Sequence, residues 1–216
     1  NRGKSVLQKA GAASAPHAAA GSRAEASVSE TIMPAASQAP QYRADLFAAL
    51  DLGTNNCRLL MAAPTKRGQF RVIDAFSRIV RLGEGLTANG RLGDAAMDRA
   101  IEALKICSDK LAARRIFQSR LIATEACRAA ANGEAFLRRV KSETGLELEI
   151  VDRETEARLA VSGCGPLVNR EVEALVLFDI GGGSSEIALI DVKHRKSPHL
   201  ADHIIAWTSL PVGVVS

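Results

Sequence analysis

Apolar and polar positions follow a strand-like pattern from residue 44 onward. The apolar runs Leu46–Asp51, Arg58–Ala63 and Phe70–Leu82 are separated by short polar turns, which predicts three successive strands in an antiparallel meander. After Gly93 the apolar residues recur at spacings of three and four, which is typical of a helix with one buried face. These helical positions are Met97, Ile101, Leu104, Cys107 and Leu111.

Strands and helices alternate in the next segment. A short strand is expected at Leu121–Thr124, and a fifth strand at Leu146–Ile150, where apolar and acidic residues alternate. A second helix is expected from Asn132 to Gly145, and a third from about Thr155 to Cys164. The order βββαβαβα predicts an α/β fold in which helices cover a mixed sheet.

The opening pattern of three strands returns in the last part of the chain. Ala174–Asp179, Ile187–Asp191 and Ile204–Leu210 repeat the meander, and the chain then ends. We therefore expect a first domain at residues 44–170 and a second, incomplete domain at residues 171–216 that has only its opening meander. A site shared by two such domains would lack part of one wall, so this chain alone could be inactive.

Residues 1–43 differ from the rest in composition. They are rich in Ala, Ser and Pro without apolar periodicity, which predicts a disordered tail. This tail carries five Lys or Arg against two Glu, and so accounts for +3 of the formal charge of +4. The remainder is close to neutral, which argues against a nucleic-acid-binding surface.

Cysteine spacing and hydropathy point to the cytoplasm. The four cysteines are scattered without a paired motif, which is typical of small buried side chains in a reducing compartment. No apolar stretch approaches the roughly 18–20 residues that a membrane helix needs. We therefore expect a cytoplasmic protein that does not bind a membrane.

One short motif occurs twice, and each time it ends an apolar run. Asp51–Asn56 and Asp179–Glu186 both read Asp, aliphatic, Gly and a small polar turn, followed by a second strand. Backbone N–H groups in such a turn can bind phosphate oxygens, and the Asp can hold a divalent cation. Ordinary glycine-containing hairpins are the alternative, but the shared order favours a duplicated phosphate-binding hairpin.

The two hairpins supply most of the candidate site residues. Asp51 and Asp179 are the candidate ligands of a shared metal ion. The candidate phosphate-binding residues of the hairpins are Gly53, Thr54, Asn55, Arg58, Gly181, Gly182, Gly183 and Ser184.

Two acidic segments lie between the hairpins. Glu125 follows the fourth strand, where it could accept a proton from water while Arg128 holds a phosphate oxygen. Glu154 and Glu156 open the third helix, and their spacing prevents both from facing the same way. In both segments the alternative is an acidic first turn that the helix dipole stabilises.

Six short motifs follow one another along the chain from about residue 44 to its end. They are Asp51–Asn56, Arg81–Leu86, Ala123–Arg128, Glu154–Arg158, Asp179–Glu186 and Leu210–Val215. In content and order these motifs resemble those of the exopolyphosphatase and guanosine pentaphosphate phosphatase family, a branch of the actin, Hsp70 and sugar-kinase superfamily.

The resemblance implies a duplicated ribonuclease-H-like fold, as in actin-like ATPases, with two domains around a cleft. It implies Mg²⁺-assisted hydrolysis of a terminal phosphoanhydride of inorganic polyphosphate or guanosine pentaphosphate (pppGpp), with release of orthophosphate. Glu125 matches the family's catalytic carboxylate, and Glu156 is favoured over Glu154 as the second catalytic residue. Asn56 and Cys57 depart mildly from the family's usual Ser followed by a bulky apolar residue.

Two other functions remain open at this point. One is a non-catalytic module that binds polyphosphate or a nucleotide, and the other is a kinase or ATPase of the same superfamily. The small residues of the second hairpin and the setting of Glu125 favour water attack over the kinase. Unpaired strand edges in an incomplete domain favour self-association, so a homodimer is one expected partner.

Overall fold

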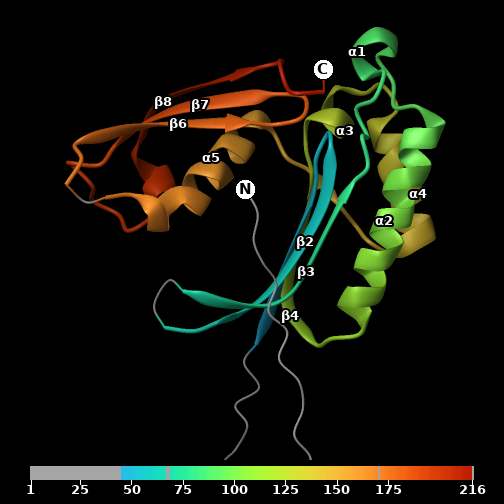
Figure 1. The fold of residues 1–216 in the computed structure, drawn as a ribbon, viewed down its shortest axis with the longest axis horizontal. Coiled ribbons are helices and arrows are strands. Elements are labelled where there is room, and N and C mark those ends of the chain that lie inside the picture. Colours follow the sequence, from blue (N-terminus) through green and yellow to red (C-terminus); the bar gives the residue numbers. More distant parts are fainter. Residues whose placement is uncertain (1–44, 67–68, 170, 216) are drawn as a thin grey trace, which may run out of the picture. The chain divides into compact units, whose positions relative to one another are not determined.

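The computed structural model describes residues 45–66, 69–169 and 171–215, so nearly all of the predicted tail at residues 1–43 lies outside the described residues. The described chain forms one five-stranded and one three-stranded sheet (Figure 1). This arrangement confirms the predicted α/β class, in which a mixed sheet with helices is followed by a second three-stranded meander.

The five-stranded sheet has the order β3-β2-β1-β4-β5. Strands β1, β2 and β3 are antiparallel neighbours, whereas β4 runs parallel to β1 and β5 runs parallel to β4. Alternate residues of β1 and β2 are buried, because one face of the sheet forms the main core. The strands are β1 (Leu46–Leu52), β2 (Asn56–Pro64), β3 (Phe70–Ile79), β4 (Ile116–Ala123) and β5 (Glu149–Ile150).

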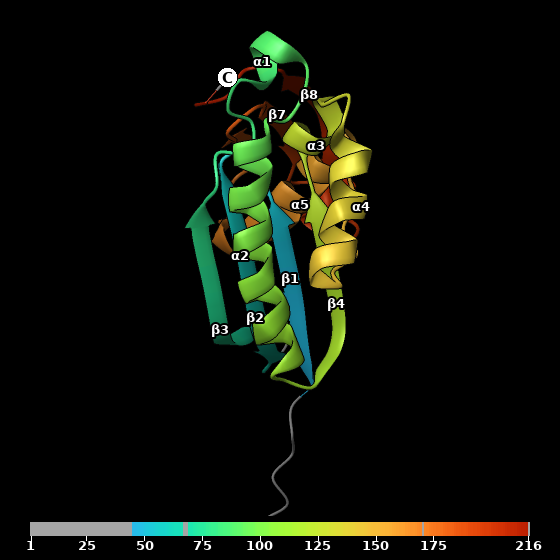
Figure 2. The ribbon, with the colours of Figure 1, turned by 90° about the vertical axis from the view of Figure 1, so that its right-hand side faces the viewer.

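Two long helices cover that face of the sheet (Figure 2). They are α2 (Asp94–Ala112) and α4 (Gly133–Thr144), and they bury Leu104 and Phe136 almost completely. The predicted apolar spacing of α2 is confirmed, except that Leu111 is only partly buried at the periphery of the core. Cys57, Cys107 and Cys127 are free and buried, which agrees with their expected role as small core residues.

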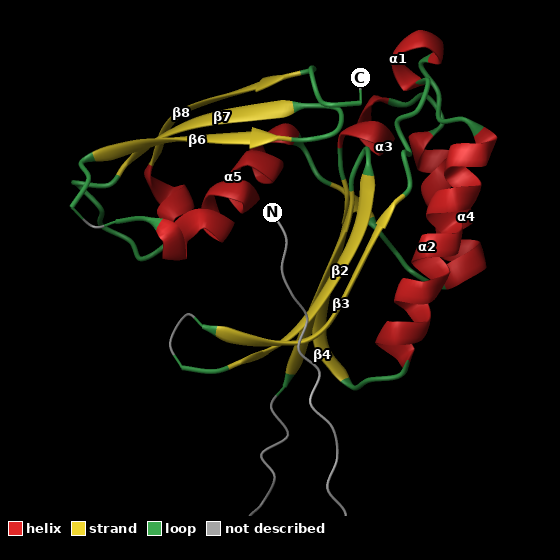
Figure 3. Ribbon diagram, viewed as in Figure 1, coloured by secondary structure: helices red, strands yellow, loops and turns green. Residues whose placement is uncertain are grey.

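The three-stranded sheet is an antiparallel meander of β6 (Ala174–Ile180), β7 (Ser185–Asp191) and β8 (Ile204–Leu210). The helix α5 (Arg153–Cys164) runs along this sheet (Figure 3). Val161 of α5 belongs to the core cluster that contains Ala188 and Ile190 of β7. The last helix before the second meander therefore packs on the second sheet.

Four short helical segments were not predicted from the sequence. They are too short to show apolar periodicity, and tertiary contacts decide where they form. These segments are α1 (Leu86–Asn89), α3 (Glu125–Ala129) and the 3₁₀ turns η1 (Gly165–Leu167) and η2 (Leu200–His203).

Three strand boundaries differ from the prediction by three residues or more. The fourth strand begins at Ile116, earlier than expected. Its first half pairs with β1 through the backbone, but most of the side chains there are exposed, so no apolar pattern marks it in the sequence. Only Glu149 and Ile150 of the expected fifth strand pair with β4. The third strand ends at Ile79, and the residues after it turn toward the first hairpin instead.

No helix in the described part of the chain is long and apolar enough to cross a membrane.

Candidate active site

The two hairpins have the same backbone geometry. In the first hairpin (β1–β2), the N–H of Gly53 donates to the carbonyl of Asn56 at 2.9 Å, and Asp51 pairs with Arg58 across the strands. In the second hairpin (β6–β7), the N–H of Gly181 donates to the carbonyl of Ser184 at 2.9 Å. There Asp179 pairs with Glu186 in the same register. The repeated sequence motif thus corresponds to a repeated local structure.

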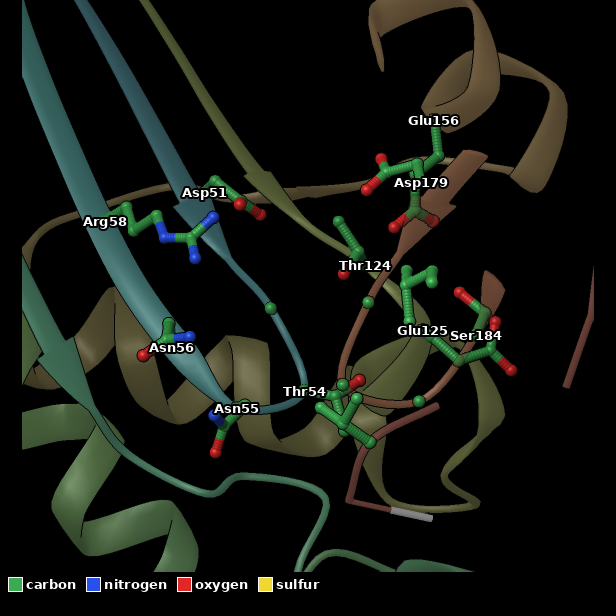
Figure 4. Close-up of a pocket in the computed structure, with 16 residues that line it drawn as sticks. Asp51, Thr54, Asn55, Asn56, Arg58, Thr124, Glu125, Glu156, Asp179 and Ser184 are labelled. Carbon is green, nitrogen blue, oxygen red and sulfur yellow. The ribbon is translucent and has the colours of Figure 1, made fainter. Parts of the chain in front are cut away.

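A cleft of about 320 Å³ lies between the two hairpins (Figure 4). It contains every predicted site residue except Arg128. The lining residues are Asp51, Gly53, Thr54, Asn55, Asn56, Arg58, Thr124, Glu125, Glu156, Asp179, Ile180, Gly181, Gly182, Gly183, Ser184 and Val214.

The tips of the hairpins lie close together, so the second one has little room for a side chain. A Cβ atom on Gly182 would lie 3.0 Å from the backbone nitrogen of Asn55, which is tighter than most such contacts. A Cβ atom on Gly183 would lie 2.7 Å from the hydroxyl oxygen of Thr54, so the side chain of Thr54 would have to move. A larger residue at either position would therefore disturb the packing of the tips beside the cleft.

Glu125 begins the short helix α3 directly after β4, and its side chain is only 8% exposed. Arg153 donates to its Oε1 atom at 2.9 Å, and the Nε atom of Arg128 donates to its Oε2 atom at 3.1 Å. Burial raises the pKa of this carboxyl, but the hydrogen bonds and charges of the two arginines outweigh it and leave the pKa below its usual value. Glu125 is therefore ionised at neutral pH.

Arg128 is occupied by protein groups. Its guanidinium donates to Glu125, to Glu156 at 3.0 Å and to the backbone carbonyl of Val151. It therefore links the two acidic segments and holds their carboxylates beside the cleft. Among the lining residues that the structure describes, the one cation is Arg58.

Glu156 lines the cleft, whereas Glu154 is not among the lining residues. Burial raises the pKa of the Glu156 carboxyl, and the negative charges of Glu186 and Asp51 raise it further. The hydrogen bond from Arg128 opposes this shift but does not cancel it. The two catalytic candidates thus differ in their environments, because Glu125 is held ionised while Glu156 is easier to protonate.

Asp51 and Asp179 lie on opposite sides of the cleft (Figure 4). The Oδ1 atom of Asp51 is buried and is the only such side-chain atom without a hydrogen-bond partner in the described chain. Burial raises the pKa of Asp51, Arg58 lowers it, and the charge of Asp179 raises it again. A buried, unpartnered carboxylate oxygen that faces a second carboxylate fits a divalent cation.

The chemistry of this donor set suits Mg²⁺ bound together with a phosphate ligand. The described residues contain no group of three or more Asp, Glu, His or Cys side chains that could hold a metal ion. Mg²⁺ commonly takes one or two carboxylates and completes its coordination with water and phosphate oxygens. Asp51 and Asp179 therefore fit a metal ion whose remaining ligands are water and phosphate oxygens.

Several residues of the site were not found from the sequence. Arg153 lies 28 positions from Glu125, and no local pattern indicates their contact. Thr124 lines the cleft, and its position between the end of β4 and Glu125 is the signal that could have identified it. Glu186 is buried in the second hairpin and accepts a hydrogen bond from Ser209 at 2.8 Å.

Fold and site together define an α/β protein with an acidic cleft between two equivalent hairpins. The model of the Ppx/GppA phosphatase family matches residues 62–216, which is more than half of the chain. The chain therefore belongs to the Ppx/GppA phosphatase family. The resemblance inferred from the six sequence motifs is confirmed.

Solved structures of two similar proteins agree with this assignment. The Ppx/GppA enzyme of Aquifex aeolicus is 30% identical with a TM-score of 0.64, and the match covers 79% of this chain and 54% of that one. An exopolyphosphatase from Cytophaga hutchinsonii is 27% identical with a TM-score of 0.68, and the match covers 78% and 51%. The chain thus spans about half the length of these two proteins.

The pKa of Glu125 provides a test of its environment. We expect the substitution Arg153→Met to raise this pKa, because the carboxylate would lose one of its two cationic partners. If ionised Glu125 is needed for phosphate release, the acidic limb of the pH–rate profile should move to higher pH. Arg120→Met is the matched control, because Arg120 forms an ion pair with Glu149 away from the cleft. An unmoved acidic limb in Arg153→Met would contradict this account.

Proposed function

We propose that this chain carries the phosphate-binding and water-orienting part of a phosphoanhydride hydrolase. Its substrate would be inorganic polyphosphate or pppGpp, and the product released at each turnover would be orthophosphate. One observation carries the proposal: ionised Glu125, held by two arginines, borders a cleft formed by two equivalent hairpins. The family assignment and the similarity to an exopolyphosphatase support it.

The reaction needs one bond to form and one to break. A water oxygen attacks the terminal phosphorus, the bridging P–O bond breaks, and the shortened chain leaves with the bridging oxygen. Glu125 orients the water and accepts its proton, while the backbone N–H groups of the hairpin tips bind the terminal phosphate oxygens. When bound, Mg²⁺ held by Asp51 and Asp179 would neutralise charge on the phosphate oxygens.

A carboxylate with a lowered pKa suits this role. Phosphoryl transfer passes through a loose transition state in which the nucleophile needs more positioning than deprotonation. Glu125 is rigidly held by Arg128 and Arg153 and remains charged over the neutral range. A weak but permanently ionised and fixed base therefore supplies what such a reaction requires.

One observation favours a second candidate function, a non-catalytic module that binds polyphosphate or a nucleotide: the chain spans about half the length of the matched structures. The charges of the cleft weigh against a long polyanion as the ligand of such a module, because four carboxylates line the cleft and Arg58 is its one described lining cation. This candidate and the hydrolase make the same prediction for binding but opposite predictions for turnover.

Phosphate release distinguishes the candidates. We would measure phosphate release with Mg²⁺ on long-chain polyphosphate, pppGpp and ATP. The two proteins compared would be this 216-residue chain and the protein encoded by its natural open reading frame. Release from polyphosphate or pppGpp supports the hydrolase and identifies its substrate. Release from ATP alone indicates the kinase or ATPase class. Binding without release from either protein supports the non-catalytic module.

A further inference from the structure

A loop next to the first hairpin holds its tip through backbone hydrogen bonds. We call residues 80–85 the support loop. The N–H groups of Val80 and Arg81 both donate to the carbonyl of Asn55, at 2.8 and 3.0 Å. Asn55 itself lines the cleft, so the position of this part of the site depends on the support loop.

A third hydrogen bond extends this contact to the next residue of the tip. The N–H of Gly83 donates to the carbonyl of Thr54 at 3.0 Å. A Cβ atom on Gly83 would lie 2.3 Å from the Cγ2 atom of Thr54, so the two segments are in close contact. Because Thr54 also contacts the second hairpin at Gly183, a shift of the support loop would disturb both tips.

The support loop adopts an unfavourable backbone conformation. Arg81 has a φ angle of +47° and is the only non-glycine residue with a positive φ in the described chain. A long side chain rarely adopts this conformation, and it persists only where surrounding contacts impose it. Contacts from outside the support loop therefore stabilise it: the first hairpin supplies one set through Thr54 and Asn55, and a further contact comes from another element.

The guanidinium of Arg99, on α2, provides that contact. Its Nε atom donates to the carbonyl of Val80 at 3.0 Å, and one Nη atom donates to the carboxylate of Glu84 at 2.6 Å. The same Nη atom lies 3.4 Å from the carbonyl of Arg81. One planar group thus binds both the start and the end of the turn, which the forked geometry of arginine permits.

The hydrogen bonds from Arg99 to backbone carbonyls stabilise the support loop more than the ion pair between Arg99 and Glu84 does. The side chains of Arg99 and Glu84 are 40% and 61% exposed, so water and salt screen their attraction. The carbonyls of Val80 and Arg81 belong to the same residues whose N–H groups hold Asn55. Arg99 therefore holds Val80 and Arg81 in place, and these two residues hold the hairpin tip at Asn55.

We propose that Arg99 is a positioning residue for the first hairpin, which acts on the site through the support loop without contacting the substrate. Its effect on the support loop follows from the contacts alone. Its effect on substrate binding rests on the proposed function, because it assumes that the tip at Thr54 and Asn55 binds a terminal phosphate. The two parts can be tested separately.

Hydrogen exchange tests the effect on the support loop without any assay of activity. In Arg99→Met we expect faster exchange at the amides of Val80 and Arg81. Arg139→Met is the matched control, because the side chain of Arg139 is 39% exposed against 40% for Arg99 and donates to the carboxylates of Glu143 and Asp98, which lie outside the support loop. Unchanged exchange at these two amides in a folded Arg99→Met would overturn the proposal. If Arg99→Met does not fold, Arg99→Lys decides by the same measurement, because a lysine ammonium lacks the fork that binds both ends of the turn.

Kinetics test the effect on substrate binding. We expect Arg99→Met to raise KM for the phosphate substrate about tenfold, and to change kcat less than about twofold, because the tip binds the substrate but the water is oriented by Glu125. Arg99→Lys should restore part of the KM. An unchanged KM together with altered amide exchange would show that the tip does not bind phosphate. A wild-type protein without turnover would instead reject the proposed function, while the exchange result would still decide the role of Arg99.

Discussion

We expect the substitution Glu125→Gln to lower phosphate release by about a thousandfold, within the range usual for loss of a general base. Glutamine keeps the size of the side chain and one carbonyl oxygen that can accept a hydrogen bond from Arg153 or Arg128. It cannot accept a proton from water and carries no charge. Binding of the substrate should change little, because the substitution leaves unaltered the hairpins that we propose bind the phosphates.

The control for this prediction is Glu134→Gln. Glu134 also lies in the first turn of a helix, but it is exposed on α4 and does not line the cleft. Phosphate release and calorimetric binding would be measured for both variants, with thermal unfolding to show that each is folded. Turnover by Glu125→Gln near that of Glu134→Gln would remove Glu125 from the mechanism.

The substitution Asp51→Asn should increase the concentration of Mg²⁺ that phosphate release requires. We expect the half-maximal Mg²⁺ concentration to rise about tenfold or more, because a neutral amide is a much weaker ligand for this hard cation. The prediction rests on the buried Oδ1 atom of Asp51, which has no hydrogen-bond partner among the residues that the structure describes. Asp98→Asn is a matched control, because Asp98 pairs with Arg139 away from the cleft.

Stability measurements test the same residue without activity. Burial raises the pKa of Asp51, so its favourable contribution to folding is complete below the unfolded value of 3.8 and is lost as the pH rises through the raised pKa. At neutral pH without Mg²⁺ the ionised carboxylate is therefore unfavourable, and Asp51→Asn should have a higher melting temperature than the wild type. Mg²⁺ added together with orthophosphate should stabilise the wild type more than the variant. Equal stabilisation of both proteins by Mg²⁺ and orthophosphate would show that Asp51 is not a ligand.

Local patterns predicted the hairpins because the chemistry of each is contained in a few consecutive residues. Gly53 and Gly181 occupy the same place in two copies of one motif, and the copies have the same hydrogen bonds. The long helices were also predictable, since their buried faces recur every three or four residues. In the hairpins and the long helices, the local conformational preference of the sequence and the pattern of buried residues favour the same structure, so the sequence was sufficient to predict them.

The remaining features depend on contacts between distant segments. The local sequence places Arg128 three residues after Glu125 and predicts that it binds a phosphate oxygen, but it does not show that the fold also brings Arg128 to Glu156 and to the carbonyl of Val151. The periodicity of α5 shows which side is apolar but cannot show that this side packs on the second sheet. Likewise, the positive φ of Arg81 is imposed by its neighbours and leaves no signal in its residue type.

The source of the oxygen in the released phosphate shows whether water attacks the terminal phosphorus. The reaction would be run in ¹⁸O-labelled water with Mg²⁺ and either polyphosphate or pppGpp, and both products would be analysed by mass spectrometry. The account predicts one solvent oxygen in each orthophosphate released, none in the shortened product, and loss of both release and labelling in Glu125→Gln. Solvent oxygen in the shortened product, or substrate binding without any release, would contradict it.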